Sequence, residues 1–540
     1  MTGPHGMRSA RPQLDELYAS GPGGIVSTSH PLATEAGVAA LRAGGHAVDA
    51  YLAAAAVQAV VEPTMTTIGG RLNVFVYDAA TRRSHTVAGP FGRPAAEDGD
   101  FDRGALRQGR TVVAPGWVCG AHAAWRRWGR RGWAELFEAA IGHATDGFVV
   151  DQLLSNQMFG YRRTIGLHPE GREVWFPGGY PLAVGDTLRQ PALAGTLARI
   201  AADGPCHMYE GDFARRYVER AHANGGRITL RDMAAHRGAA VTAEVRAVPT
   251  ASGHELHTGA TLLGMALNLA HIGRLADRGR IAKRGESLYL ALRIVEECWH
   301  AGLDAATASG PAVEKRLVEL AAPEHAERLW PEVESGRPRP YNPVPSETNA
   351  LVVVDADGNV AHGSHSITSV PFGAGLMVDG VIVARPVSLY THPIDLADTT
   401  GALVGGVLGA PPGVGTSVLV TRNGRPVFAA ASPSISCFTN LFQNAVNVLE
   451  HGMDPLESVH QPLFGAPEEA TLKPMVEATM GLDVLAEAER RGARITPVSP
   501  WEVEMGSCQA VHWDADGTPH GVADPRRRGR VAALPAPARR

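Results

Sequence analysis

The chain has 540 residues, of which 44% are hydrophobic and 19% are charged, and its net charge is -5. This composition is typical of a folded globular protein and excludes a chain that is mostly disordered. The small negative charge provides no basic field for nucleic acid or an anionic membrane, so neither is expected as a partner. Glycine is frequent, at 62 residues, without a collagen-like repeat, which indicates many tight turns and close backbone approaches.

Cysteine usage and the N-terminus predict a cytoplasmic protein. The five cysteines are scattered without a CxxC pair, and the first 13 residues lack the apolar run of a signal peptide. The longest apolar stretches reach about half of a membrane span. The histidines are not spaced with acidic or cysteine partners as metal ligands, and the glycine-rich stretches lack a P-loop lysine. We therefore expect no metal and no cofactor.

The first part of the chain is predicted to be mainly helical. Proline and glycine punctuate two helices, Leu32–Leu41 and Ala47–Val60, and the second is apolar on nearly all faces, so it should be buried. A strand is expected at Leu72–Tyr77. Helices with short loops follow over about Trp117–Ala322, and Pro323–Pro345, rich in Pro, Glu and Arg, is expected to form an exposed linker.

After this linker the hydrophobic period changes to that of strands. A β-branched run at Ala350–Val354 and a second strand at Val360–Ile367 flank the hairpin turn Asp355–Asn359. The later elements are strands at Ser417–Thr421 and Val427–Ala430 and helices at Thr439–His451, Pro467–Thr479 and Leu482–Arg491. Helices, a linker, then hairpins and further helices indicate an α+β layered fold in which two halves of the chain share one core.

Thr348 is the candidate nucleophile, because it opens a buried-looking strand directly after the predicted linker. If the chain were cut between Glu347 and Thr348, this residue would carry both a hydroxyl and a free α-amine. An α-amine has a pKa near ~7.7, so it can take the hydroxyl proton at neutral pH. The alternative is a structural threonine, which is the usual role at a strand start, and the local pattern leaves both interpretations open.

The predicted hairpin supplies a partner for Thr348. With the turn near Asp357, the residue opposite Thr348 is Ser366 or Ile367, and a Ser366 hydroxyl could hydrogen-bond and tune that of Thr348. The alternative is an ordinary cross-strand Thr–Ser pair.

Motifs along nearly the whole chain resemble the γ-glutamyltransferase family of N-terminal-nucleophile hydrolases. The segments that carry the resemblance are Ser29–Gly37, Ala43–Ala50, Val61–Pro63, Ile68–Gly70, Ala114–Gly116, Trp133–Phe137, Ile228–Met233, Ser346–Gly358, Phe372–Gly375, Met505–Ser507 and Ala523–Arg526. The resemblance implies a four-layer αββα sandwich and a precursor that cuts itself before Thr348. It also implies that residues 1–347 form a large subunit and residues 348–540 a small one. The Thr348 hydroxyl would then attack a substrate carbonyl, and water or an acceptor amine would release the acyl group.

The chain departs from the family where γ-glutamyl enzymes hold the glutamate. The arginine that holds the α-carboxylate falls on Pro90, with Arg93 nearby but in a different place. The acidic pair for the α-ammonium should lie near Ala384–Leu389, which contains no carboxylate, and the family's Ser-Ser pair falls on Gly413 and Val414. Because missing charges cost several kcal/mol of discrimination, the resemblance does not extend to glutathione as the substrate.

Other departures concern the catalytic surroundings. The family's oxyanion Gly-Gly pair falls on Ser434 and Ile435, whose backbone amides could still donate to an oxyanion. The second threonine of the nucleophile strand is Asn349, and the asparagine two positions after Ser366 is Thr368. We expect Asn349 and Thr368 to contribute to substrate binding.

Two arginines stand where the family usually has none. Arg71 replaces a glycine after the Ile68–Gly70 motif, and Arg385 lies near the lost acidic pair. A guanidinium is a good bidentate reader of carboxylates, so both are candidate binding residues for a small carboxylated substrate. The alternative is that each packs against a surface acid.

Three functions follow from these observations. The first is a self-processing Thr hydrolase acting on a small carboxylated metabolite. The family resemblance offers it two chemistries: amide hydrolysis of acids such as oxamate, and hydrolytic carbon–carbon cleavage that removes an oxalyl-type group in alkylproline antibiotic pathways. The second is a genuine γ-glutamyl hydrolase or transferase with a re-routed clamp. The third is an uncleaved, inactive binding protein.

Overall fold

Two stacked β-sheets form the centre of the molecule in this computed structural model, which describes residues 14–96, 109–308, 311–339, 341, 348–368, 371–386, 413–468 and 471–536. Within those residues each sheet has seven strands, and all neighbours are antiparallel. Sheet B consists, in spatial order, of β21 (Arg530–Leu534), β2 (Gly24–Thr28), β10 (Asn349–Asp355), β11 (Val360–Ser366), β3 (Arg71–Asp78), β4 (Arg83–Gly89) and β7 (Val241–Val245). Sheet A consists of β1 (Tyr18–Ser20), β20 (Pro519–Ala523), β19 (Gln509–Trp513), β15 (Arg425–Ala431), β14 (Ser417–Arg422), β9 (Glu255–His257) and β8 (Val248–Pro249).

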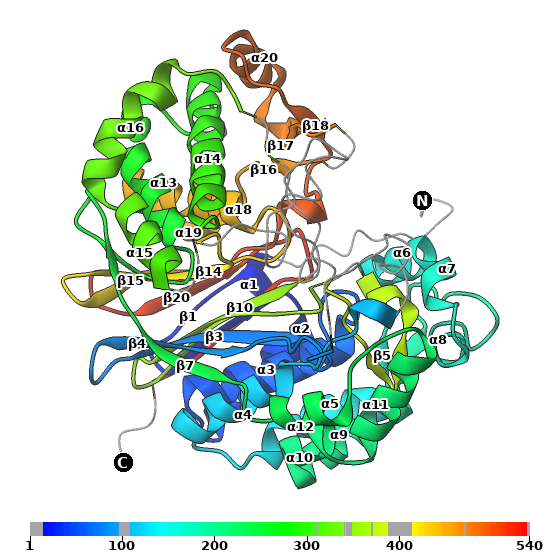
Figure 1. The fold of residues 1–540 in the computed structure, drawn as a ribbon. Coiled ribbons are helices and arrows are strands. Elements are labelled where there is room, and N and C mark those ends of the chain that lie inside the picture. The colour runs from blue at the N-terminus through cyan, green and yellow to red at the C-terminus, as the bar shows by residue number, and fades with distance from the viewer. Residues whose placement is uncertain are drawn as a thin grey trace, which may run out of the picture.

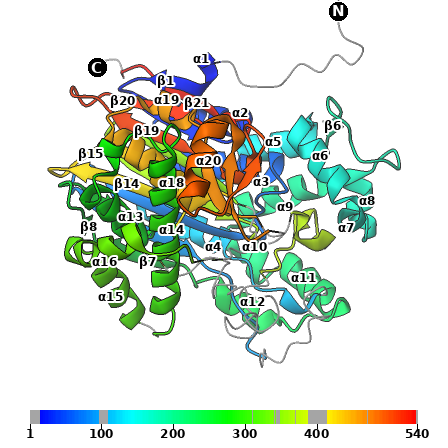
Figure 2. The ribbon, with the colours of Figure 1, turned by 90° about the horizontal axis from the view of Figure 1, so that it is seen from above.

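Helices cover the outer face of each sheet (Figure 1; the view from above is Figure 2). The helices that share a core with sheet B are α2 (Pro31–Arg42), α3 (Ala47–Val61), α4 (Trp117–Trp128), α5 (Glu138–Asp146), α6 (Gln152–Gly160), α7 (Arg162–Ile165), α8 (Pro169–Trp175), α9 (Pro191–Asp203), α10 (Pro205–Tyr209), α11 (Asp212–Ala223) and α12 (Leu230–His236). Those that share a core with sheet A are α13 (Thr261–Ile272), α14 (Gly285–Ala305), α15 (Pro311–Leu320), α16 (Pro323–Ser335), α18 (Cys437–Ala445), α19 (Pro455–Val459) and α20 (Leu482–Arg490). A short helix, α1 (Leu14–Leu17), precedes β1.

The side chains of β10 alternate between two cores. Leu351 and Val353 belong to the core under the helices of sheet B, whereas Ala350, Val352 and Val354 belong to the core between the sheets. Successive residues of a strand point to opposite faces, so a strand buried on both faces needs the continuous apolar run that the sequence shows. The predicted α+β class and the four-layer αββα sandwich are therefore confirmed.

Most predicted elements of the first half and the nucleophile hairpin are confirmed. The helices predicted from Leu32 and Ala47 are α2 and α3, and all fifteen residues of α3 are buried. His46 caps α3 through its ring nitrogen, and Asp49 completes a capping box. The predicted hairpin is β10–β11, and the strand predicted from Leu72 is β3.

Two sequence predictions were wrong. The start of the predicted exposed linker is helix α16, because Pro323 occupies the first turn, where proline is tolerated, and Ala326 and Val333 are buried. No α-helix is present among the described residues of the helix predicted over Pro467–Thr479, which instead include the end of one strand and the whole of another. Pro474 removes a helical donor, and Glu477 is buried in an ion pair with Arg526. Within the described residues the smaller sheets are β5 (Phe148–Val149) with β6 (Thr187–Leu188), β12 (Met377–Val378) with β13 (Val381–Ile382), and β16 (Phe464–Pro467) with β17 (Pro474–Glu477) and β18 (Thr496–Val498).

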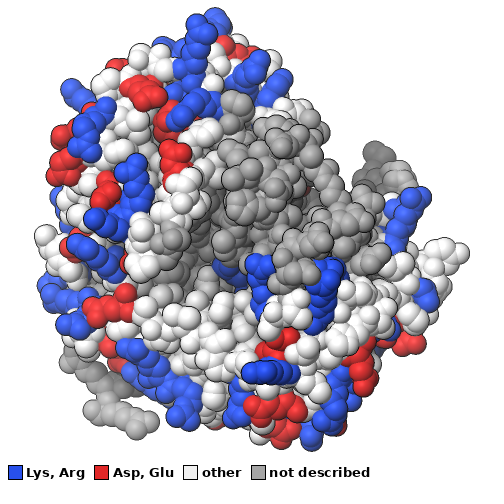
Figure 3. Space-filling model, in the orientation of Figure 1, with Lys and Arg blue, Asp and Glu red and all other residues white. Residues whose placement is uncertain are grey.

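Basic and acidic side chains are interspersed on the face of the molecule that Figure 3 shows. This distribution agrees with the small net charge of the chain. A mixed surface of this kind generates little long-range attraction for a polyanion.

Gly70 is a position where the glycine excess has a clear physical reason. A Cβ added there would lie 2.2 Å from the carbonyl oxygen of Ser366 on the neighbouring strand. The Gly70 carbonyl also accepts hydrogen bonds from the backbone N–H groups of Gly116 and Trp117, at 2.8 and 2.9 Å. Three chain segments therefore meet at Gly70 with no room for a side chain.

We predict that Gly70→Ala destabilises the protein by roughly 1–3 kcal/mol, because the added methyl group forces the backbone of Ser366 to move. Thermal unfolding at fixed scan rate measures the effect. Gly178→Ala is the matched control, since an added Cβ there meets nothing within 4 Å. Equal melting temperatures for the two variants would contradict the prediction.

Candidate active site

Thr348 lies at one end of the central strands of sheet B, where β10 begins and β11 ends. The register pairs Asn349 with His365, which brings Thr348 opposite Ser366. The Thr348 hydroxyl donates to the Ser366 hydroxyl across 3.0 Å, and the two residues are only 7% and 4% exposed. The hydrogen bond expected from the hairpin is therefore present. Both side chains lie on the inner face of sheet B, in line with Ala350 and Val352.

Ser366 is also held by Thr368. The backbone N–H and the hydroxyl of Thr368 donate to Ser366 Oγ at 2.7 and 2.9 Å. Thr368 has a φ of 47°, which is rare for a β-branched residue and indicates that its neighbours impose this conformation. The described contacts of Thr368 therefore orient Ser366, the hydrogen-bond partner of the candidate nucleophile.

The loop that contains Ser434 and Ile435 follows β15 of sheet A, and hydrogen bonds connect it to β11 of sheet B. Ser432 N–H donates to the Thr416 carbonyl at 2.8 Å, and the Thr416 hydroxyl donates to Ser364 on β11, also at 2.8 Å. Ser434 has a φ of 79°, the left-handed region that a glycine would adopt freely.

Two backbone amides of this loop are available to a ligand. Among the described residues, no hydrogen-bond acceptor is found for the N–H groups of Ser434 and Ile435. The Ser434 hydroxyl instead donates to the Glu504 carbonyl at 2.6 Å and accepts from Ser436 N–H at 3.1 Å, which holds the loop in place. Successive N–H groups beside a left-handed residue form a typical anion-binding nest. The backbone can therefore serve as an oxyanion hole although the glycines are absent.

Arg71 opens β3 directly opposite Ser366 and is half-buried. With the Asn73 amide in the orientation that satisfies both of its polar atoms, Asn73 Oδ1 accepts from the Arg71 guanidinium at 2.7 Å. Among the described residues no carboxylate forms an ion pair with Arg71. Burial lowers the pKa of Arg71 to about 10, so it still carries its charge at neutral pH. A partly buried guanidinium without a counter-charge is a natural site for a substrate carboxylate.

Arg385 is the second arginine that the sequence suggests as a binding residue. It is buried after β13, and burial lowers its pKa to about 10. Its charge contributes to lowering the pKa of His168, which precedes α8. The predicted position of the missing acidic pair is described only to Pro386, and residues 387–389 lie outside the described residues.

Pro90 and Gly413 are two positions on which the family resemblance places residues of the glutamate clamp. Pro90 follows β4, and its carbonyl lies 2.7 Å from the His236 ring nitrogen. The Gly413 carbonyl accepts from Leu262 N–H at 3.0 Å, at the start of α13. Neither Pro90 nor Gly413 carries a side chain that could hold an ammonium or carboxylate group.

Asn349 has its side chain on the opposite face of sheet B from Thr348. Asn349 Nδ2 donates to Glu62 Oε2 at 3.0 Å, and its Oδ1 accepts from Arg527 at 3.3 Å. Arg527 also donates to the Thr348 carbonyl at 2.9 Å. Since Asn349 is fully buried in these contacts, we propose that it positions the start of β10 rather than touching substrate.

Glu62 is a site residue that sequence reasoning missed. Its Oε2 also accepts from Ser29 at 2.9 Å and from Gln58 at 3.0 Å. Burial is the main cause that raises the pKa of Glu62 to about 7, and Arg527 opposes that shift. The available signal was an acid at the end of a helix that is otherwise buried on every face.

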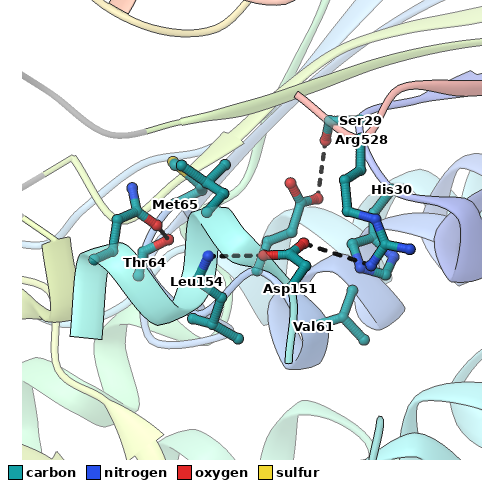
Figure 4. Close-up of a pocket in the computed structure, with 11 residues that line it drawn as sticks. Ser29, His30, Val61, Thr64, Met65, Asp151, Leu154 and Arg528 are labelled. Atoms are coloured by element: carbon teal, nitrogen blue, oxygen red, sulfur yellow. Dashed lines mark hydrogen bonds and ion pairs between the residues drawn. The ribbon is translucent and has the colours of Figure 1, made fainter. Parts of the chain in front are cut away.

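A pocket open to solvent adjoins Glu62, between the end of α3, the start of α6 and the segment before β21 (Figure 4). Figure 4 shows Asp151 between Arg528, with which it forms an ion pair at 3.5 Å, and the N–H of Leu154, which it caps at 2.7 Å. His30 also lines this pocket, and burial lowers its pKa to about 3. The pocket therefore gives the Glu62 carboxyl a route for proton exchange with solvent.

The described residues contain neither a candidate metal site nor a candidate membrane-spanning helix. In the part of the chain that the structure describes, no group of three or more His, Cys, Asp or Glu residues could hold a metal ion. No helix among those residues combines the length and apolarity needed to span a bilayer. All five cysteines are free thiols.

A hydroxyl residue at the open end of a central strand, between two antiparallel sheets covered by helices, places the fold in the N-terminal-nucleophile hydrolase class. The chain belongs to the gamma-glutamyltranspeptidase family, whose model matches residues 33–534. Membership of this family makes the chain a hydrolase, as the motifs of the sequence predicted.

Individual relatives agree with this assignment. The chain is 25% identical to the glutathione hydrolase proenzyme of Bacillus subtilis, over 95% of this chain and 92% of the relative. It is 28% identical to the acylase ACY 1 proenzyme of a Pseudomonas strain, over 94% of both chains. The crystal structure of cephalosporin acylase from Bacillus halodurans has the same fold, with a TM-score of 0.78, 22% identity and 99% of both chains covered.

We predict that Glu62→Gln changes how stability depends on pH. Because the pKa of Glu62 is raised to about 7 in the fold from an ordinary 4.5, its ionisation destabilises the native state. This cost is fully present above pH 7 and disappears below about pH 4.5. The melting temperature of Glu62→Gln minus that of wild type should therefore increase from pH 5 to pH 8.

Because the variant and the wild type are compared at the same pH, the contribution of all other titrating groups to the melting temperature cancels. Glu35→Gln serves as the control, since that carboxylate forms a surface ion pair with Arg530 at 2.8 Å. A difference for Glu62→Gln that stays constant over this pH range would show that Glu62 does not titrate there.

Proposed function

We propose that the chain is a self-processing hydrolase that cleaves a small carboxylated metabolite through an acyl-enzyme on Thr348. The observation that carries the proposal is the buried hydrogen bond of 3.0 Å between the hydroxyls of Thr348 and Ser366 at the start of β10. Two relatives are named as proenzymes, which supports processing of this chain as well.

Self-processing would begin when Thr348 Oγ attacks the carbonyl carbon of Glu347. The new C–O bond replaces the peptide C–N bond, so the chain passes through an ester with a free Thr348 amine. Water then hydrolyses the ester and leaves a large subunit of residues 1–347 and a small subunit of residues 348–540. These two subunits would remain associated, because β10 and β11 lie between strands β2 and β3 of the large subunit.

Turnover would use the same hydroxyl. The freed α-amine takes the Thr348 hydroxyl proton while Oγ adds to the substrate carbonyl. The amides of Ser434 and Ile435 donate to the resulting oxyanion, a type of interaction worth roughly 2.7–4 kcal/mol per donor. The proton passes to the leaving group as the acyl-enzyme forms, and water releases the acyl group and restores the hydroxyl.

The substrate proposed for this site carries a carboxylate. Arg71 lacks an acidic partner among the described residues and lies opposite Ser366, so a substrate anion would sit next to the nucleophile. Arg385 is a second candidate carboxylate reader. Amide hydrolysis and hydrolytic removal of an oxalyl-type group from carbon both fit this arrangement, the latter in alkylproline-type antibiotic biosynthesis. A cytoplasmic location, supported by the five free thiols, completes the proposal.

We predict that the 56.9 kDa chain converts on a denaturing gel into pieces of about 36 and 20 kDa, in proportion to their lengths. Thr348→Ala should abolish this conversion because it removes the nucleophile. Ser366→Ala should slow it by about 2–10-fold, the usual cost of losing one hydrogen bond between neutral groups.

Thr348→Ser is the control, because it keeps a hydroxyl at the same place and should still be cleaved. A single band after long incubation of the wild-type chain would favour an uncleaved binding protein. Mass spectrometry of the smaller piece checks that it begins at Thr348.

We predict that the processed enzyme releases little amine from a γ-glutamyl anilide. Pro90 replaces the arginine of the glutamate clamp, and Gly413 and Val414 replace its serine pair. An amine-release assay measures the rate, and robust turnover would instead identify a genuine γ-glutamyl enzyme with a different clamp.

A further inference from the structure

The inner face of sheet B is open to solvent along β3. Arg71, Asn73 and Phe75 point to this face and are all half-buried, whereas the residues between them belong to the core beneath the helices. On the same face of β10, Ala350 and Val352 are completely buried. On this face the side chains of β10 are therefore shielded from solvent, whereas those of β3 remain partly accessible.

The register of β3 with β11 connects this accessible face to Thr348. Ser366 pairs with Arg71, Ser364 with Asn73, and His362 with Phe75. Paired residues lie about 4.5–5.5 Å apart, and a strand rises about 3.4 Å per residue. The row thus begins one strand from Ser366. Because the Arg71 guanidinium reaches Asn73, only two residues, or roughly 7 Å along β3, separate it from Phe75. We call the row Arg71–Asn73–Phe75 the β3 groove.

The end of the β3 groove nearest Thr348 is cationic. Arg71 has one hydrogen bond to a described residue, to Asn73 Oδ1, and a guanidinium has five N–H donors. The other donors are available to a carboxylate, and Arg71 is the cross-strand neighbour of Ser366, whose hydroxyl accepts from Thr348. An anion bound here would sit close to the carbonyl under attack.

The far end of the β3 groove is a flat apolar wall. The Phe75 ring stacks on His362, with centroids 5.3 Å apart and planes 16° apart. His362 is completely buried, neither of its ring nitrogens has a described hydrogen-bond partner, and burial lowers its pKa to about 3, so the ring is neutral. On the opposite side, a Cβ added to Gly259 would lie 3.0 Å from Phe75 Cζ, which shows that the tip of the ring lies close to the segment after β9.

We propose that the β3 groove binds the substrate part that carries a carboxylate near the scissile carbonyl and a planar apolar group beyond it. Arg71 holds the carboxylate, Asn73 keeps the guanidinium in place, and Phe75 contacts the planar group. This inference rests on the proposed function, since it specifies the substrate class of the same site. It assigns specificity to Phe75 and Asn73, and the order along the groove is carbonyl, carboxylate, ring.

Three acetylated amines test that order with processed wild-type enzyme. N-acetyl-L-phenylalanine has the carboxylate and the ring, N-acetyl-L-alanine has only the carboxylate, and N-acetylphenethylamine has only the ring. In each case the acetyl carbonyl forms a C–O bond to Thr348, the C–N bond breaks, the amine leaves with the proton, and water releases acetate. We expect kcat/KM for N-acetyl-L-phenylalanine to exceed that of both others at least tenfold.

Variants then separate the two ends of the groove. Arg71→Gln should remove most of the preference for N-acetyl-L-phenylalanine over N-acetylphenethylamine, and Arg71→Lys should keep part of it because the charge remains. Phe75→Leu should reduce kcat/KM for N-acetyl-L-phenylalanine about tenfold more than it reduces kcat/KM for N-acetyl-L-alanine. Cleavage into the two expected pieces on a denaturing gel checks that Phe75→Leu folds and processes normally.

The possible failures are distinguishable. If the wild-type chain remains uncleaved, or if amine release persists in Thr348→Ala, the proposed function itself fails. If the chain processes but shows equal kcat/KM for the three compounds, the groove assignment is overturned. A processed enzyme that neither hydrolyses N-acetyl-L-phenylalanine nor binds it by calorimetry at millimolar concentration also overturns the assignment and leaves the processing intact.

Discussion

The antiparallel register between β10 and β11 is the constraint on which the candidate site depends. It brings Thr348 opposite Ser366, and the next pairs along β3 bring Arg71 beside the same serine. A shift of one residue would turn Thr348 to the helical face and Asn349 to the inner face. The buried valines of β10 oppose such a shift, because they fill the two cores on alternate sides. The packing of an apolar strand thus determines which hydroxyl faces the space between the sheets.

The polar groups on the two faces of sheet B differ in their contacts near the start of β10. On the helical face, Glu62, Asn349 and Arg527 form a hydrogen-bonded chain in which the asparagine lies between a carboxyl and a guanidinium. On the inner face, Arg71 has a polar neighbour but no described acid. Buried polar groups that are hydrogen-bonded to one another fix each other's position, whereas a charge without a counter-charge attracts a ligand of opposite charge. This contrast separates the groups that position the strand from those proposed to bind substrate.

The loop with Ser434 and Ile435 has a backbone suited to an oxyanion although its side chains differ from the family pattern. Ser434 has a left-handed φ, which glycine would adopt at lower energy, and the amides of the loop face no described acceptor. Oxyanion stabilisation by backbone amides needs no particular side chain. Recognition of a glutamyl group does need charged and polar side chains, and the family resemblance places these on Pro90 and Gly413. The same fold can therefore keep its chemistry while its substrate changes.

The sequence alone determined the layered class and the hairpin, because these follow from local periodicity and an Asp-Gly turn. It left Ser366 or Ile367 opposite Thr348, and the register of the structure selects Ser366. It could not reveal that Glu62 and Arg527 meet at Asn349, since these contacts join residues 287 and 178 positions apart. It also misassigned the helix at Pro323 and the strands around Pro474, where tertiary burial overrides local composition. Only the tertiary structure decided which polar side chains are paired within the protein and which remain open to a ligand, because pairing depends on how distant segments pack.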